Sequence, residues 1–206
     1  MKPTPKRHSL LLLLFLLLVT AACGKTPAIR PLAADATVLA FGDSLTAGSG
    51  ARPEESYPAV LAGLLGRSVV NAGVPGEVSA EGLARLPALL DETQPALVLL
   101  CHGGNDFLRR QSREETKANL RRMVALIRER GIDVILVGVP EPGLLLSASP
   151  IYAELAEEFR IPCEEEALAE VLADRTLKSD QIHPNGAGYA VLARRLKAFI
   201  DEAAGG

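Results

Sequence analysis

The stretch Leu97-Val98-Leu99-Leu100 is an unbroken run of large apolar residues. A strand with one face in water alternates apolar and polar residues, whereas a strand covered on both faces reads as a continuous apolar run. Short runs of apolar and β-branched residues occur at residues 37–41, 68–72, 96–100 and 133–138. These segments predict strands that lie between two layers of helices.

Apolar residues at helical spacing separate the predicted strands. The clearest example is Leu120, Met123, Val124 and Ile127, which share one helix face. Further helices are indicated at residues 57–65, 83–90, 152–160, 164–173 and 186–202. Strands that alternate with helices form parallel sheets with helices on both faces. The sequence therefore predicts an α/β fold, a three-layer α/β/α sandwich with a central parallel sheet, in one domain over residues 36–204.

The N-terminus has the layout of a secretory signal. Lys2, Lys6 and Arg7 precede an apolar run at residues 10–19, and small residues follow that run. The run is half as long as the ~20 residues that a membrane-spanning helix needs. We expect residues 1–22 to be a signal peptide.

Cys23 comes directly after this segment, and residues 19–23 resemble a bacterial lipobox. The resemblance implies acylation of the Cys23 thiol, with residues 23–35 as a lipidated tether that holds the domain to a membrane. Because Gly24 and not aspartate follows the cysteine, it also implies a periplasm-facing lipoprotein of the outer membrane. The alternative is ordinary cleavage after Ala22, which leaves a soluble periplasmic protein.

Composition narrows the possible partners. The formal net charge is −3, and removal of residues 1–22 takes away three bases and no acid, so that it becomes −6. An acidic domain argues against a nucleic-acid partner. Cys101 and Cys163 indicate buried thiols, not a disulfide framework. The Cys and His spacing suggests no metal site, and we expect neither a metal nor a cofactor.

Two motifs at opposite ends of the domain supply the groups of a nucleophilic triad. Ser44 follows the first predicted strand in Phe41-Gly42-Asp43-Ser44-Leu45, and His183 lies in Asp180-Gln181-Ile182-His183-Pro184-Asn185. A histidine can take the proton of a serine hydroxyl, and a carboxylate three residues earlier can orient the ring. The structural alternative for Ser44 is a helix cap. We expect the other histidine of the domain, His102, to take a core or loop position.

Two glycine-rich segments follow other predicted strands and can carry donors for an oxyanion. Asn105 in Gly103-Gly104-Asn105-Asp106 offers a neutral amide, although Asn105 or Asp106 could equally cap a helix. After the second strand, either Gly73 or Gly76 could present a backbone N–H to the site, and the segment itself does not choose between them.

Together these blocks resemble, in their order and at their strand ends, the motifs of the SGNH (GDSL) hydrolases. Residues 82–90 are similar to a bacterial subgroup with acyl-CoA thioesterase, lysophospholipase and arylesterase activities. The resemblance implies a flavodoxin-like fold. It also implies that Ser44 is the nucleophile, His183 the base and Asp180 its orienting partner. The oxyanion hole would consist of the N–H of Ser44, Gly76 and Asn105.

The implied activity is that of a serine esterase, which hydrolyses small-molecule esters, thioesters or lipids through an acyl-serine intermediate. The alternatives are a carbohydrate or cell-wall acetyl esterase and a non-catalytic surface lipoprotein. The chain departs from the subgroup at Cys101-His102, where an acidic and an aliphatic residue are usual, and over residues 141–150. Leu144-Leu145-Leu146 in that segment offers apolar surface either to an acyl chain or to the core.

Overall fold

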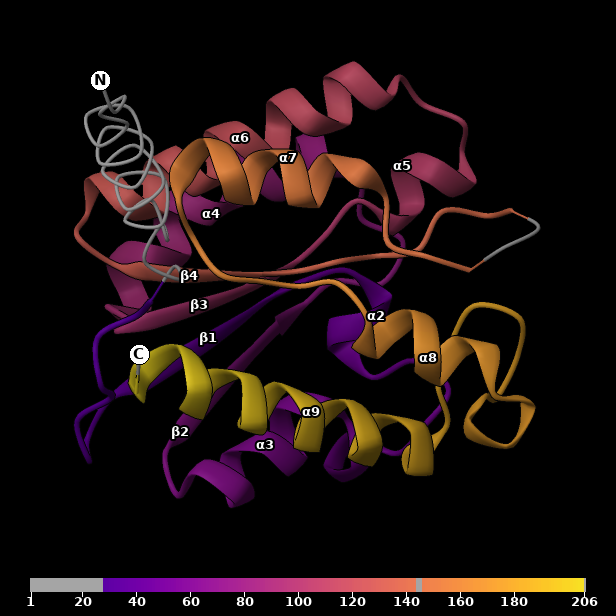
Figure 1. Cartoon of the computed structure of the whole chain (residues 1–206), viewed down its shortest axis with the longest axis horizontal. Coiled ribbons are helices and arrows are strands. Elements are labelled where there is room, and N and C mark those ends of the chain that lie inside the picture. The colour runs from indigo at the N-terminus through magenta and orange to yellow at the C-terminus, as the bar shows by residue number, and fades with distance from the viewer. Residues whose placement is uncertain (1–27, 144–145, 206) are drawn as a thin grey trace, which may run out of the picture.

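The computed structural model describes residues 28–143 and 146–205. In these residues five parallel strands form one sheet of order β2-β1-β3-β4-β5, and helices cover both of its faces (Figure 1). The strands are β1 Thr37–Gly42, β2 Ser68–Gly73, β3 Leu97–Cys101, β4 Asp133–Val137 and β5 Cys163–Glu164. The predicted α/β class and parallel sheet are confirmed, and the strands expected from the apolar runs are present.

The apolar run Leu97–Leu100 lies in β3, the middle strand of the sheet. Each residue from Leu97 to Cys101 is fully buried, as a strand covered on both faces should be. β2 differs, because its residues are only half-buried or exposed. The expectation that Val69 and Val70 are covered on both faces is therefore wrong, since β2 is an edge strand that pairs with β1 alone.

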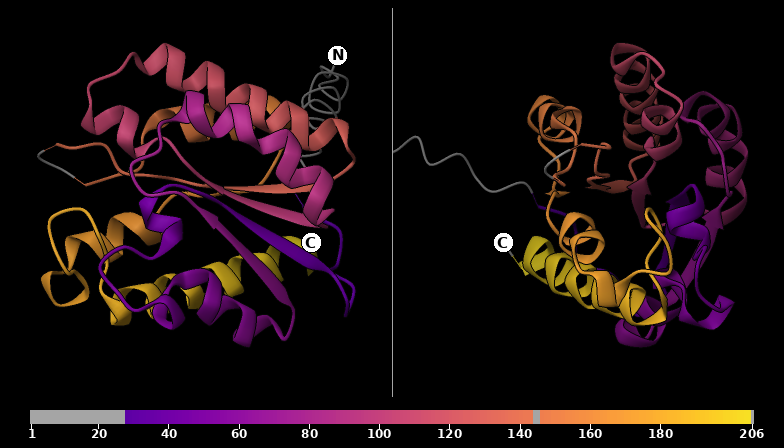
Figure 2. Two further views of the ribbon diagram at one scale, coloured as in Figure 1. Left: turned by 180° about the vertical axis from the view of Figure 1, so that it is seen from behind. Right: turned by 90° about the vertical axis from the view of Figure 1, so that its right-hand side faces the viewer.

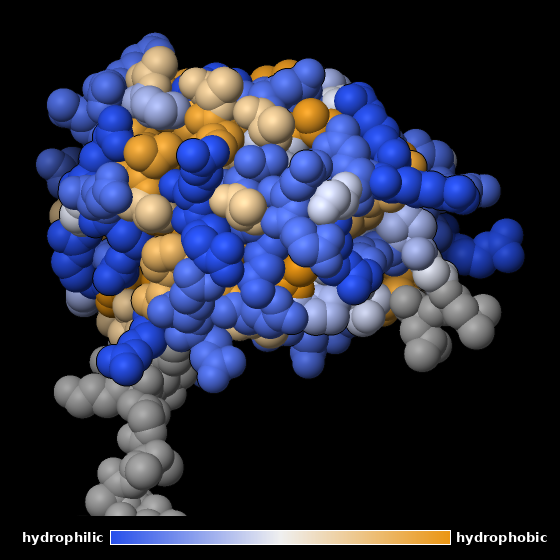
Figure 3. Space-filling model, turned by 90° about the horizontal axis from the view of Figure 1, so that it is seen from above, coloured by the Kyte–Doolittle hydropathy of each residue, from blue (hydrophilic) through white to orange (hydrophobic). Residues whose placement is uncertain are grey.

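Two sets of helices enclose the sheet (Figures 1 and 2). One face carries α4 (Ser79–Thr93), α6 (Arg113–Glu129) and α7 (Pro150–Phe159), and the other carries α3 (Tyr57–Leu65), α8 (Ala167–Ala173) and α9 (Gly186–Gly205). The short helices α2 (Ser44–Ala47) and α5 (Gly104–Leu108) follow β1 and β3, and two 3₁₀ helices span Pro53–Glu55 and Arg175–Leu177. Ion pairs such as Arg121–Glu158 join α6 and α7 on a mainly hydrophilic face (Figure 3).

The helix expected at residues 164–173 begins later than predicted. Cys163 and Glu164 form β5, which pairs with β4, and α8 starts at Ala167. The side chain of Glu164 turns back to accept a hydrogen bond from the N–H of Ala167 at 2.8 Å. Sequence periodicity misses this strand because it has two residues and three consecutive glutamates begin within it.

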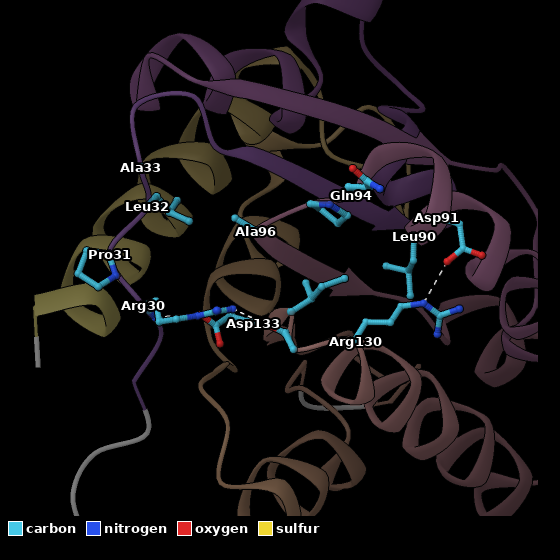
Figure 4. Close-up of a pocket in the computed structure, with 13 residues that line it drawn as sticks. Arg30, Pro31, Leu32, Ala33, Leu90, Asp91, Gln94, Ala96, Arg130 and Asp133 are labelled. Carbon is cyan, nitrogen blue, oxygen red and sulfur yellow. Dashed lines mark hydrogen bonds and ion pairs between the residues drawn. The ribbon is translucent and has the colours of Figure 1, made fainter.

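Residues 28–35 do not behave as the tether that the sequence indicates, because they pack on the domain. Ile29 is buried and donates its N–H to the carbonyl of Ala203 in α9. Arg30 pairs with Asp133 at 2.9 Å, beside a cavity of about 520 Å³ in which Arg130 and Asp91 form a second ion pair (Figure 4). The folded unit therefore extends to at least Ile29.

The predicted signal peptide and Cys23 lie outside the described residues. Within residues 28–143 and 146–205, no helix has the length and apolar character needed to cross a bilayer.

Candidate active site

The predicted site residues meet at the carboxyl ends of the strands. Ser44 directly follows the loop after β1, Asn105 follows β3, and Asp180 and His183 lie in the loop before α9. In open parallel α/β sheets this edge is where ligands bind, because successive loops converge there. Ser44 and His183 are 139 residues apart in the sequence, and the fold brings their side chains within hydrogen-bond distance.

Three side chains form a continuous hydrogen-bonded chain. The Nε2 atom of His183 lies 3.0 Å from the Oγ of Ser44, and its Nδ1 lies 2.8 Å from the Oδ2 of Asp180. A carboxylate can only accept, so Nδ1 carries the proton and donates it to Asp180. Nε2 is then free to accept from the Ser44 hydroxyl, which is the tautomer that a general base requires.

Asp180 is ionised and held in place by its own loop. Its Oδ1 accepts the backbone N–H groups of Ile182 and His183, each at 2.8 Å. Burial acts to raise the pKa of Asp180, but the hydrogen bonds from His183 and from these N–H groups outweigh burial, so the pKa lies below its ordinary value. The carboxylate therefore keeps the charge that stabilises an imidazolium.

The loop that carries Asp180 and His183 is closed at its base. The N–H of Ser179 donates to the carbonyl of His183 at 3.0 Å, and the N–H of Asn185 donates to the carbonyl of Leu177 at 2.8 Å. The side chain of Asn185 also donates to the carbonyl of Thr176 and accepts from the N–H of Gly188 in α9. These bonds give the His183 ring a fixed approach.

A second set of contacts joins this loop to the loop of Ser44. Tyr189 of α9 donates its hydroxyl proton to the carbonyl of Ser49 at 2.9 Å. Gly50 has φ of +92°, and a Cβ there would lie 2.1 Å from the Oγ of Ser179. This close approach requires glycine, and it keeps the nucleophile and base loops at a constant distance.

Asp43 is buried next to Ser44 and caps α2. Its Oδ1 accepts the N–H of Leu45 at 3.1 Å. Burial raises the pKa of Asp43 above its ordinary value. Ser44 itself is the first residue of α2, so the capping role that the sequence left open for it belongs to Asp43.

The structure distinguishes the two glycines after β2. The N–H of Gly73 donates to the Oδ1 of Asn71 at 3.0 Å, and a Cβ on Gly73 would lie 2.1 Å from the N of Ala47. Gly73 is thus used for hydrogen bonding and close packing against α2. The N–H of Gly76 has no acceptor among the described residues, and Gly76 has φ of +81° in the turn that Val74 and Glu77 close.

Asn105 projects from the second residue of α5 toward the same turn. Its Nδ2 donates to the carbonyl of Glu77 at 3.0 Å, which orients the amide and leaves its second N–H available. Asp106 has a structural role that differs from the one the sequence suggested, which was a cap of its own helix. It accepts the N–H and the hydroxyl of Ser79, and so holds the start of α4.

A cleft of about 320 Å³ opens beside Ser44 and His183. Its lining includes the apolar residues Leu45, Leu108, Val139, Pro140, Pro142, Leu146, Leu172 and Ile182. Of the predicted leucine cluster, Leu146 lines the cleft and is 41% exposed, whereas Leu144 and Leu145 lie outside the described residues. The described residues contain no group of three or more His, Cys, Asp or Glu side chains arranged to hold a metal.

The two cysteines of the domain are free thiols, Cys101 buried and Cys163 half-buried. Burial raises the pKa of both thiols far above the ordinary value, so neither is a reactive thiolate. Neither thiol is therefore a candidate for the nucleophile of this site.

The fold and the site define a serine hydrolase on a parallel α/β/α sandwich. The model of the GDSL-like lipase/acylhydrolase family matches residues 40–191, and the chain belongs to this family of ester-hydrolysing serine enzymes. The thioesterase 1/protease 1/lysophospholipase L1 of Escherichia coli K12 is 37% identical over 180 residues, which cover 84% of this chain and 82% of that protein. Esterase TesA of Pseudomonas aeruginosa is 33% identical over 180 residues, covering 81% and 89%. A crystal structure of TesA has a TM-score of 0.72 and 30% identity, covering 81% of this chain and 99% of that one.

Proposed function

We propose that the protein hydrolyses carboxylic esters and thioesters with an apolar acyl chain through an acyl intermediate on Ser44. The observation that carries the proposal is the chain of hydrogen bonds from Ser44 Oγ to His183 Nε2, and from His183 Nδ1 to Asp180, at the edge of an apolar cleft. This geometry activates a hydroxyl that is otherwise unreactive at neutral pH.

In the first step the Oγ of Ser44 forms a bond to the carbonyl carbon while its proton moves to Nε2 of His183. The carbonyl electron pair becomes the oxyanion. When this intermediate collapses, the bond to the leaving oxygen or sulfur breaks and His183 returns its proton to the leaving group. Water then attacks the acyl-serine by the same route, which releases the acid and restores Ser44. Asp180 stabilises the imidazolium in both steps.

We assign the oxyanion to three donors, the N–H of Ser44, the N–H of Gly76 and the amide of Asn105. Support for Gly76 comes from its unused N–H, since the N–H of Gly73 is already bound to Asn71. Support for Asn105 comes from its fixed amide plane. Loss of one such donor reduces kcat on the order of 10²-fold or more.

The cleft favours an acyl chain over a small acetyl group. Leu108, Leu146 and Ile182 line it and are 44%, 41% and 40% exposed, so an acyl chain would cover apolar surface that is now in water. Each buried CH₂ contributes about 0.8 kcal/mol. A carbohydrate or cell-wall acetyl esterase gains nothing from such a lining.

The proposal is tested with p-nitrophenyl esters of increasing acyl length, acyl-CoAs and a lysophospholipid. We expect kcat/KM to rise from acetyl to octanoyl esters, and a fall along this series contradicts the apolar acyl site. Ser44→Ala should abolish hydrolysis with an unchanged circular dichroism spectrum. Ser68→Ala, at the exposed start of β2, is the matched control and should keep full activity. Activity in Ser44→Ala rejects the mechanism, and a folded wild-type protein inactive on every substrate supports the non-catalytic alternative.

We further propose that the protein is exported and tethered to the periplasmic side of the outer membrane by acyl chains on Cys23. The support is the signal-like segment at residues 1–22 and the lipobox-like residues 19–23. Labelling with an alkyne-palmitate probe should mark the wild-type protein and not Cys23→Ser. Equal labelling, or release of the wild-type protein with the soluble periplasm, contradicts the anchor.

A further inference from the structure

A buried cluster of three ionisable side chains lies behind the oxyanion side of the site. Glu77 comes from the turn after β2, Arg85 from α4 and His102 from the end of β3. Their side chains are 6%, 25% and 0% exposed. The guanidinium of Arg85 donates to both carboxylate oxygens of Glu77 at 2.6 and 2.7 Å, and Nε2 of His102 lies 3.0 Å from Oε2 of Glu77.

Arg85 also reaches the backbone of two strand ends. Its Nη2 donates to the carbonyl of Ala72 at 2.8 Å and to the carbonyl of Gly42 at 3.2 Å. Gly42 is two residues before Ser44, and Ala72 is four residues before Gly76. The same guanidinium lies over the ring of Phe41, 4.2 Å from its centroid. One planar group thus binds the β1 end, the β2 end and the turn that holds Gly76.

The third loop is attached to the cluster through Glu77 and His102. The carbonyl of Glu77 accepts the amide of Asn105, while its carboxylate accepts Arg85 and His102. His102 is three residues before Asn105. A Cβ on Gly82 would lie 2.4 Å from Nε2 of His102, so α4 packs directly on the imidazole ring. All three loops with oxyanion donors therefore connect to one buried ion pair.

The carboxylate of Glu77 stays ionised over the pH range in which a serine hydrolase works. Burial acts to raise the pKa of Glu77, but the hydrogen bonds from His102 and Arg85 outweigh it and lower the pKa to about 2. The ionised carboxylate of Glu77 accepts from Nε2–H of His102. The Nδ1 atom of His102 is buried without a partner among the described residues. An imidazole used only through Nε2 is oriented by Glu77 and by packing.

We propose that Arg85, held by Glu77 and His102, is a positioning residue that fixes the N–H groups of Ser44 and Gly76 and the amide of Asn105 relative to one another. The inference rests on the proposed oxyanion hole and adds a device that sets its geometry. Arginine is required because only a planar guanidinium with five N–H donors can bind both oxygens of a carboxylate and backbone carbonyls at the same time.

The test is Arg85→Lys, which keeps the charge but replaces the fork by a single ammonium. We expect kcat for a p-nitrophenyl ester to fall 10- to 100-fold with KM within about threefold, because an oxyanion forms in the transition state and not in the bound ester. The same variant should react more slowly with a p-nitrophenyl phosphonate. The total amount of p-nitrophenol released should still equal that of the wild-type protein, one per folded chain. A wild-type kcat, or a loss of amplitude that accounts for the whole loss of rate, overturns the inference.

The matched control is Arg121→Lys, which breaks a two-sided arginine–glutamate pair between α6 and α7, away from the site. It should leave kcat and KM unchanged. If Arg85→Lys melts below the assay temperature, Glu77→Gln replaces it, and the same fall in kcat at constant KM is required. Failure of the proposed function looks different, since Ser44→Ala would then retain the activity of the wild-type protein.

Discussion

Asp180 uses its two oxygens for different purposes, and this division makes one substitution informative. Oδ1 accepts two backbone N–H groups of its own loop, while Oδ2 accepts from Nδ1 of His183. In Asp180→Asn the amide oxygen stays with the two N–H donors, which turns the NH₂ group toward His183. The ring must then accept at Nδ1 and carry its proton on Nε2, the wrong tautomer for a base.

We therefore expect Asp180→Asn to reduce kcat about 10²- to 10⁴-fold with little change in melting temperature, because its backbone hydrogen bonds are kept. Stopped-flow release of p-nitrophenol measures the effect on acylation. Asp174→Asn is the control, since Asp174 caps a 3₁₀ helix with the same type of hydrogen bond, to the N–H of Thr176. A loss of kcat within tenfold for Asp180→Asn would contradict the orienting role.

At the scale of elements, the contact between β2 and α2 sets the position of the nucleophile. Gly73 ends β2 where α2 crosses it, and a Cβ would meet the backbone of Ala47 and of Thr46 at 2.1 and 2.6 Å. Backbone atoms cannot move aside as a flexible side chain can. Gly73→Ala must therefore shift α2 and Ser44 with it.

We expect Gly73→Ala to reduce kcat at least tenfold and to destabilise the fold by about 1–3 kcal/mol, as overpacking does. Gly63→Ala is the paired control, because Gly63 lies within α3 with no atom near its missing Cβ. It should keep full activity and stabilise the protein by up to ~1 kcal/mol. Urea unfolding followed by circular dichroism, together with esterase kinetics, checks both. Equal behaviour of the two variants contradicts the close contact.

Elements were predictable where their signal is local. The strands around Leu97–Leu100 follow from apolar runs, and the motifs of Ser44 and Asn105 lie at strand ends that those runs define, whereas the motif of His183 lies in the loop before α9. β5 was missed because two residues carry no period. The cluster of Glu77, Arg85 and His102 was also missed, since its members belong to three segments that meet only after the sheet forms. The roles of Gly76 and Asn105 remain predictions until their variants are measured.

At the scale of the whole molecule, α9 connects two functional ends. It begins at Gly186, three residues after His183, and its residue Ala203 accepts the N–H of Ile29. At 1.5 Å per residue these positions are about 25 Å apart. The segment that leads to the proposed anchor thus packs at the amino end of the strands (Figures 1 and 4). The cleft beside Ser44 and His183 lies at the carboxyl end.

This separation predicts that the N-terminal segment stabilises the fold without taking part in catalysis. A chain that begins at Ala36 loses the burial of Ile29 and the ion pair of Arg30 with Asp133. It also loses the carbonyls of Leu32 and Ala33, which accept hydrogen bonds from Arg67. Burial of one such side chain contributes about 1.5–3 kcal/mol. For a domain of this size 1 kcal/mol corresponds to roughly 2–4 °C, so the melting temperature should fall by about 3–12 °C relative to a chain that begins at Ala28.

The kcat of the shorter chain, measured well below its melting temperature, should equal that of the longer one. Ile29→Ser in the longer chain serves as the control that separates apolar packing from loss of the backbone contacts, and it should produce part of the fall in melting temperature. Equal melting temperatures for the chains that begin at Ala28 and Ala36 would show that residues 28–35 do not stabilise the fold and act only as a tether. A lower kcat at equal stability would instead show that the two ends of α9 are coupled, because among the described residues the cavity that the segment lines shares no lining residue with the cleft.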